Sequence, residues 1–246
     1  MKKTELIMGM PITVEVVDKS GDEYLVMVFD YFRKIDARYS TYKKNSEISL
    51  INNGLPKEKW SKEMKTVLGL CEQTLQDTYG YFNIKHNGKL DPSGLVKGWA
   101  VANAANSLLK KKVVNFYIEA GGDIQAHGHD ASHNSWTVGI RNPFNVSEII
   151  KTIVISSEGV ATSGTYIRGQ HIYNPFDPDI AISRVKSLTV IGPNVFEADR
   201  YATAAFAMGE KGIGFIESKT GLEGYMVTDD KLATYTSGFV RYLANV

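Results

Sequence analysis

The order of apolar patterns along this chain of 246 residues predicts an α+β fold. After one strand that begins behind Pro11, helical spacing of apolar residues dominates the first part of the chain. Runs typical of strands follow, and a helix and a hairpin end the pattern. This order favours an α+β arrangement over regular βαβ winding, and no repeat or linker divides the chain. We therefore expect residues 1–246 to form a single domain.

Serine residues mark the expected helix starts. A helix should follow residues 20–23 and end near Arg38, and Ser46 and Ser61 should cap two further helices. Ser93 is expected to cap a central helix through its hydroxyl. The other expected elements are strands at 12–16, 116–120, 124–127, 136–140, 152–156 and 188–191, a helix at 198–208, a second helix that ends near Gly221, and a hairpin of 225–228 with 232–236.

Composition narrows the class of protein. The formal net charge is +1, which gives no indication of a nucleic-acid partner. The single cysteine, Cys71, excludes an intrachain disulfide. No apolar run is long enough to insert in a membrane, and Met1 is not followed by the apolar core of a signal peptide. We expect a cytoplasmic protein.

The stretch 91–98 combines groups that suit a phosphate. The free N–H groups of a helix's first turn favour an anion, and Lys97 can add a full positive charge. Asp91 offers an acceptor, and Gly94 and Gly98 allow close approach of backbone to a ligand. An ordinary capped helix with a solvated lysine is the alternative explanation of this stretch.

Asp199 and Thr203 lie four residues apart, hence on one face of a helix that is otherwise rich in alanine. A carboxylate and a hydroxyl are hard oxygen ligands of the kind that Mg²⁺ takes. A polar pair on a helix surface is the alternative. A charge within so apolar a helix nevertheless needs a reason.

Two further stretches carry polar or flat groups. Thr162, Ser163 and Gly164 follow an expected strand and can present hydroxyls and N–H groups to an anion. His171 can act as a general base or be a structural histidine. Tyr39 and Tyr42 flank a loop and can stack on a flat ring, or simply end a helix as partly exposed tyrosines.

Taken together, and in their order along the chain, these stretches resemble the ApbE family of FAD:protein FMN transferases. Nine motifs carry the resemblance, and together they cover nearly the whole chain. They are Met8-Gly9-Met10, Tyr39-Ser40-Thr41-Tyr42 with Ser46-Glu47-Ile48 and Asn52, Gly80-Tyr81-Phe82-Asn83, 91–98, Glu119-Ala120-Gly121-Gly122-Asp123-Ile124, 136–140, Ala161-Thr162-Ser163-Gly164, 171–175 and 198–203.

The resemblance implies an ApbE-like, T-fold-like architecture with mixed or antiparallel sheets, packed helices and a flavin cleft between two halves. It implies FAD contacts, a Mg²⁺ ligand set and a histidine that acts in transfer. The FAD-contacting positions are Met8, Tyr42, Tyr81, Phe82, Asn83, Asp91, Lys97, Thr162, Ser163, Gly164 and Tyr173; the metal ligands are Gly94 through its carbonyl, Asp199 and Thr203; the histidine is His171.

Several positions depart from the family pattern. Asn83, Asn103 and Asn174 stand where the family has a carboxylate, and Arg200 replaces a small residue after the metal aspartate. The segment between Phe82 and Asp91 is also shorter than usual. These changes lower the negative charge expected around the site and leave the implied metal ligands intact.

The resemblance implies a Mg²⁺-dependent reaction in which FAD is the substrate. A Ser or Thr hydroxyl of an acceptor flavoprotein would attack the FMN-side phosphorus, releasing AMP and leaving FMN in a phosphoester bond. The alternatives are hydrolysis of FAD to FMN and AMP, FAD binding without catalysis, and an interaction domain that uses no flavin. The preserved pair of Asp199 and Thr203 argues against a pure binder.

Overall fold

A computed structural model describes residues 1–18, 22–165, 172–178 and 180–244. Its centre is an eight-stranded sheet of order β1-β2-β5-β6-β9-β10-β11-β12, and every pairing recorded in it is antiparallel. The strands of this sheet are β1 (Lys2–Ile7), β2 (Met10–Val16), β5 (Phe116–Ala120), β6 (Asp123–His127), β9 (Gly159–Gly164), β10 (Val185–Gly192), β11 (Glu223–Thr228) and β12 (Ala233–Tyr235).

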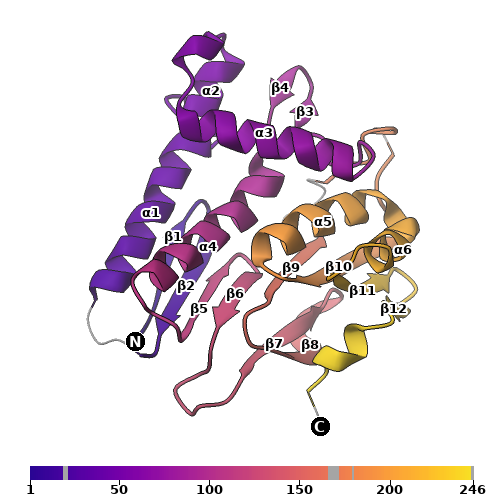
Figure 1. Cartoon of the computed structure of the whole chain (residues 1–246). Coiled ribbons are helices and arrows are strands. Elements are labelled where there is room, and N and C mark those ends of the chain that lie inside the picture. The colour runs from indigo at the N-terminus through magenta and orange to yellow at the C-terminus, as the bar shows by residue number, and fades with distance from the viewer. Residues whose placement is uncertain (19–21, 166–171, 179, 245–246) are drawn as a thin grey trace.

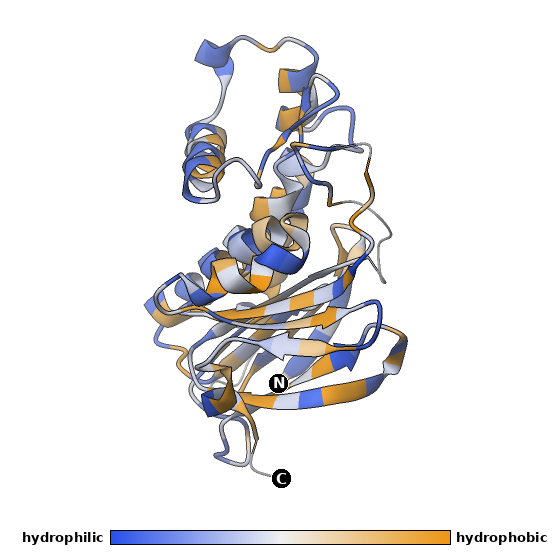
Figure 2. Cartoon of the chain, turned by 90° about the vertical axis from the view of Figure 1, so that its right-hand side faces the viewer, coloured by the Kyte–Doolittle hydropathy of each residue, from blue (hydrophilic) through white to orange (hydrophobic). Residues whose placement is uncertain are grey.

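Helices cover one face of the sheet, and a hairpin covers part of the other (Figures 1 and 2). The hairpin is β7 (Trp136–Asn142) with β8 (Asn145–Ile155), and a second small hairpin, β3 (Lys85–His86) with β4 (Lys89–Leu90), stands at the edge of the helical layer. The helices are α1 (Glu23–Tyr39), α2 (Glu47–Asn52), α3 (Lys62–Asp77), α4 (Ser93–Lys110), α5 (Val195–Ala207) and α6 (Gly212–Glu217), with 3-10 turns η1 (Lys57–Lys59), η2 (Gly209–Lys211) and η3 (Phe239–Tyr242).

Alternating side chains explain how the sheet joins these layers. In β2, Ile12, Val14 and Val16 are buried while the residues between them are more exposed. Successive side chains of a strand point to opposite faces, so this pattern gives one apolar face. That face packs against α1 and α4 in the first core cluster. The predicted α+β class is thus confirmed.

Two of the expected helix caps are confirmed. The Ser46 hydroxyl accepts the Ser49 N–H at 3.2 Å, and the Ser61 hydroxyl accepts the Met64 N–H at 3.1 Å. The expected cap at Ser93 is wrong. Ser93 is already helical, Pro92 occupies the cap position, and the Asp91 carboxylate accepts the Ser93 N–H at 3.0 Å.

The strands differ from expectation at several places. The chain begins with β1, which the sequence pattern did not reveal, and β8 is longer than the expected 152–156. Thr162, Ser163 and Gly164 lie within β9 rather than after it, because their backbone pairs with residues 187–189 of β10. The expected strand at 116–120 and the closing hairpin are confirmed.

The expected helix that ends near Gly221 is shorter than predicted. α6 ends at Glu217, and the Lys219 N–H turns back to the Ile216 carbonyl. Gly221 then takes a left-handed conformation, with φ of +81°. A residue in that conformation ends a helix instead of extending it.

α4 and α5 touch at a glycine. A Cβ on Gly98 would lie 2.5 Å from the Asp199 Cβ and 2.9 Å from the Val195 carbonyl oxygen. The absent side chain lets the Gly98 N–H donate to Asp199 Oδ2 at 2.8 Å. This contact brings the start of α4 and the middle of α5 together.

Within the described ranges, no helix is both long and apolar enough to cross a membrane. Cys71 is a buried free thiol, and burial raises the pKa of that thiol to about 12.

We expect Gly98→Ala to lower the free energy of unfolding by about 1–3 kcal/mol, because the new methyl group overpacks the contact between α4 and α5. Gly69→Ala is the matched control, since Gly69 is exposed on α3 with nothing within 4 Å of the added carbon. It should raise stability by up to about 1 kcal/mol. Urea unfolding measures both, and equal midpoints would contradict the packing argument.

Candidate functional site

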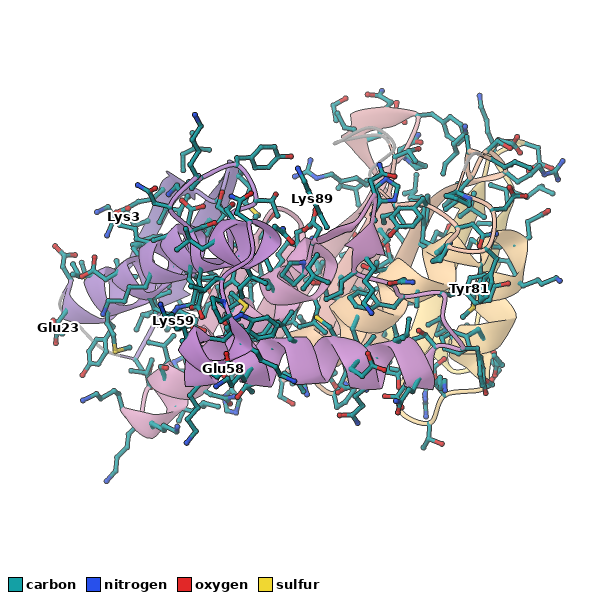
Figure 3. All side chains as sticks on the ribbon, turned by 90° about the horizontal axis from the view of Figure 1, so that it is seen from above. Lys3, Glu23, Glu58, Lys59, Tyr81 and Lys89 are labelled. Carbon is teal, nitrogen blue, oxygen red and sulfur yellow. The ribbon has the colours of Figure 1, made fainter. Side chains whose placement is uncertain are left out.

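A cavity of about 960 Å³ lies between the helical part of the chain and the β9–β10 part. Its walls come from the start of α4, the middle of α5, the end of β9, the β3–β4 hairpin and the segment around Tyr173. The view from above shows Tyr81 past the end of α3 and Lys89 on the small hairpin (Figure 3). The volume is near the upper end of the roughly 300–1,000 Å³ of ordinary ligand pockets, so a large ligand fits.

Most residues implied by the resemblance line this cavity. Met8 does not: it forms the tight turn between β1 and β2, at φ of +57°, and packs against the first core cluster. His171 lies outside the described residues. Those that line the cavity are Tyr42, Tyr81, Phe82, Asn83, Asp91, Gly94, Lys97, Thr162, Ser163, Gly164, Tyr173, Asp199 and Thr203.

Three oxygen-bearing groups that could ligate a cation meet where α4 and α5 cross. The Thr203 hydroxyl donates a long hydrogen bond of 3.4 Å to the Gly94 carbonyl, and Asp199 lies one helical turn before Thr203. In an α-helix the Gly98 N–H points at the Gly94 carbonyl four residues back, so its bond to Asp199 competes with the helical one. A carboxylate, a hydroxyl and a carbonyl gathered in this way suit a hard cation.

A second carboxylate lies beneath the first. Asp123, at the start of β6, is fully buried, and the Lys97 ammonium lies 2.8 Å from its Oδ2. The Thr162 N–H and the Asp199 carboxyl also lie close enough to influence Asp123. The cluster therefore holds two carboxyl groups and one ammonium.

The electrostatics of this cluster favour an added positive charge. Burial, and then the negative charge of Asp123, raise the pKa of Asp199 well above its usual range, while Lys97 opposes the shift. Burial likewise raises the pKa of Asp123 against the effect of Lys97. A cation next to Asp199 would offset this cost of burying two carboxylates.

An aromatic wall closes one side of the cavity. The Tyr173 hydroxyl donates to the Asn83 carbonyl at 3.0 Å, and its ring centroid lies 4.4 Å from that of His86. Tyr81 meets Phe176 edge to face, with centroids 4.9 Å apart. These contacts join the segment after α3 to the segment after β9.

The two tyrosines near the end of α1 have different environments. Tyr39 is buried and packs on Trp99, so it cannot stack on a ligand in the cavity. Tyr42 is 96% exposed at the cavity rim and is free to contact one.

Asn52 holds the small hairpin beside the cavity. Its side-chain amide donates to the Leu90 carbonyl at 2.9 Å and accepts the Leu90 N–H at 2.8 Å. An asparagine side chain here pairs with a backbone residue as a neighbouring strand would. Asp91 follows directly, so this pair fixes the approach to α4.

Comparison with known proteins identifies the family. The model of the ApbE family matches residues 8–88 and 85–226. The chain belongs to the ApbE family. Its fold is that of solved ApbE structures: it superposes on a flavin transferase ApbE from Vibrio cholerae with a TM-score of 0.87, at 20% identity and 99% coverage of both chains. An ApbE protein from Thermotoga maritima gives 0.87 at 19% identity, with 100% of this chain and 99% of that chain covered.

Curated relatives carry the name FAD:protein FMN transferase. One from Haemophilus influenzae is 27% identical over 166 residues, which cover 63% of this chain and 48% of the relative. One from Vibrio cholerae is 28% identical over 159 residues, which cover 60% of this chain and 48% of the relative. The match thus spans about half the length of these relatives.

The residues that depart from the ApbE pattern lie in different parts of the structure. Asn83 lines the cavity, and its Oδ1 accepts the Lys85 N–H. Asn174 accepts the Phe176 N–H and thereby shapes the turn of the aromatic wall. Asn103 lines a separate hollow beside Tyr31 and Glu63. The replacement of a carboxylate by an amide at this position therefore lies outside the cavity.

Arg200 points away from the cavity as well. It is buried and pairs with Asp77 of α3 and Glu197 of α5, both at 2.8 Å. A large cation is tolerated after Asp199 because these two carboxylates neutralise it. Arg200 thereby ties the end of α3 to the helix that carries Asp199.

Sequence reasoning missed two contributors to the site. Asp123 was visible only as part of a Gly-Gly-Asp motif, and its burial beside Asp199 depends on the packing of β6 under α5. His86 gave no signal, because its contact with Tyr173 joins two segments that are distant in the chain.

We expect Asn52→Ala to loosen the β3–β4 hairpin, because two side-chain hydrogen bonds to Leu90 are lost. Each such bond contributes about 0.5–1.5 kcal/mol. Hydrogen exchange followed by mass spectrometry should show faster exchange in peptides that contain Leu90 and Asp91. Asn53→Ala is the control, because Asn53 also lines the cavity but its side chain makes no hydrogen bond within the described part of the chain. Identical exchange in both variants would refute this role.

Proposed function

We propose that this protein is a Mg²⁺-dependent FAD:protein FMN transferase acting on an acceptor flavoprotein. The observation that carries the proposal is the gathering of Gly94, Asp199 and Thr203 at the floor of a cavity large enough for a dinucleotide. The curated relatives with this name support it.

The first turn of α4 is the proposed phosphate-binding element. N–H groups at a helix start favour an anion, although Asp91 already accepts the one at Ser93. Lys97 lines the cavity one turn further on and adds a full positive charge. These groups would hold the FAD pyrophosphate against α4.

The oxygen set of Gly94, Asp199 and Thr203 would hold the cation. When bound, Mg²⁺ supplies charge neutralisation to the pyrophosphate oxygens during phosphoryl transfer. Asp199 must then be ionised, and the Gly98 N–H helps by donating to its Oδ2.

The reaction proposed is attack of an acceptor Ser or Thr hydroxyl on the FMN-side phosphorus of FAD. The new bond joins that oxygen to phosphorus, and the P–O bond to AMP breaks. His171 remains the predicted acceptor of the hydroxyl proton. The aromatic wall of Tyr81 and Tyr173 offers flat surfaces beside the cavity for the flavin ring.

The flavin contacts implied at Met8 and the single-domain organisation stay predictions. So does the cytoplasmic location expected from the sequence.

Mass spectrometry of a threonine-containing acceptor peptide, incubated with the protein, FAD and Mg²⁺, should show a mass gain of one FMN. Asp199→Asn should slow adduct formation by about 100-fold or more, since several kcal/mol of charge stabilisation depend on the cation. Asp177→Asn is the control: this exposed carboxylate lies in the segment 172–178, and no side-chain partner of it is found among the described residues. Release of FMN and AMP without an adduct would contradict transfer in favour of hydrolysis.

Removing the cation from the wild-type protein should also prevent adduct formation. We expect EDTA to abolish adduct formation and added Mg²⁺ to restore it, because the pyrophosphate charge is otherwise uncompensated. Transfer at an unchanged rate in EDTA would show that Lys97 and the helix start suffice without a cation.

A further inference from the structure

The buried cluster beneath the cavity contains one more carboxylate than the proposed cation site needs. Asp123 is completely buried at the start of β6, and the Lys97 ammonium is the charged partner that lies against its Oδ2. Asp123 is absent from the cavity lining, whereas Lys97 and Asp199 belong to it. A fully buried carboxylate is costly unless a partner compensates its charge, and Lys97 is that partner here.

Lys97 lies against Asp123 in this cluster. Its ammonium lies 2.8 Å from Asp123 Oδ2, although Asp199 is also within the same cluster. Asp199 instead accepts the Gly98 N–H and lies one helical turn before Thr203 on α5. One carboxylate therefore holds the lysine while the other stays with the oxygen set.

We infer that Asp123 is a positioning residue that keeps the Lys97 ammonium away from Asp199, and so leaves the Asp199 carboxylate available to a divalent cation. This inference rests on the proposed cation site. It assigns Asp123 no contact with the cation or with FAD. Groups behind metal ligands commonly change metal affinity by about 10- to 100-fold.

The competition is electrostatic and has a definite sign. Without the Asp123 charge, Asp199 is the carboxylate of this cluster that still attracts Lys97, and an ion pair there would compete directly with a cation. Removing the lysine as well would remove the competitor. A purely structural Asp123 would give no such recovery.

The test is Mn²⁺ binding to the nucleotide-free protein, followed by the electron paramagnetic resonance signal of free Mn²⁺. We expect Asp123→Asn to weaken binding at least ~10-fold. The double variant Asp123→Asn/Lys97→Met should recover to within about threefold of the wild-type affinity, and Lys97→Met alone should not weaken binding. Circular dichroism and thermal unfolding report whether each variant is folded.

Asp177→Asn is the matched control for the loss of one negative charge, because that residue is exposed in the segment 172–178. Its Mn²⁺ affinity should stay unchanged. Equal weakening in Asp123→Asn and in the double variant, both folded, would overturn the inference and leave the proposed transfer standing. Absence of Mn²⁺ binding by the wild-type protein would overturn the inference together with the cation site on which it rests, whereas the peptide assay tests transfer separately.

Discussion

The hydrogen bond from the Gly98 N–H to Asp199 Oδ2 is the contact on which the site depends. It requires α4 and α5 to approach so closely that no side chain fits at position 98. That approach brings the Gly94 carbonyl to the Thr203 hydroxyl and places Lys97 above Asp123. A helix start, which favours anions, and a cluster of oxygens, which favours cations, thus share one floor.

The rest of the fold holds these two helices in place. The eight-stranded antiparallel sheet supports both of them on one face, with α4 over the first strands and α5 over β9 and β10. Arg200 adds a tie from α5 to the end of α3 through Asp77. From there the chain runs into Tyr81 and Asn83, so the aromatic wall is joined to the helix that carries Asp199.

Charge and burial oppose each other at the floor of the cavity. Burial raises the pKa of both Asp123 and Asp199, and the negative charge of Asp123 raises that of Asp199 further, while Lys97 opposes both shifts. A scaffold without a ligand would be more stable with fewer charges here. The cost of burying these carboxylates is explained if the site binds a cation together with a phosphate-rich substrate, because the bound groups then compensate one another's charges.

Local pattern was enough to predict the α+β class, the caps at Ser46 and Ser61, the strand at 116–120 and the polar pair of Asp199 and Thr203, because caps, periodicity and spacing are short-range properties. The ordered motifs led to the ApbE family, which the comparisons bear out. Tertiary structure alone decided that Asp91 rather than Ser93 binds the first N–H of α4, that Met8 packs against the first core cluster and that Asn103 faces a different hollow. It also placed Asp123 under Asp199, because the two are 76 positions apart in the sequence (199 − 123) and only the packing of β6 beneath α5 brings their carboxyl groups together.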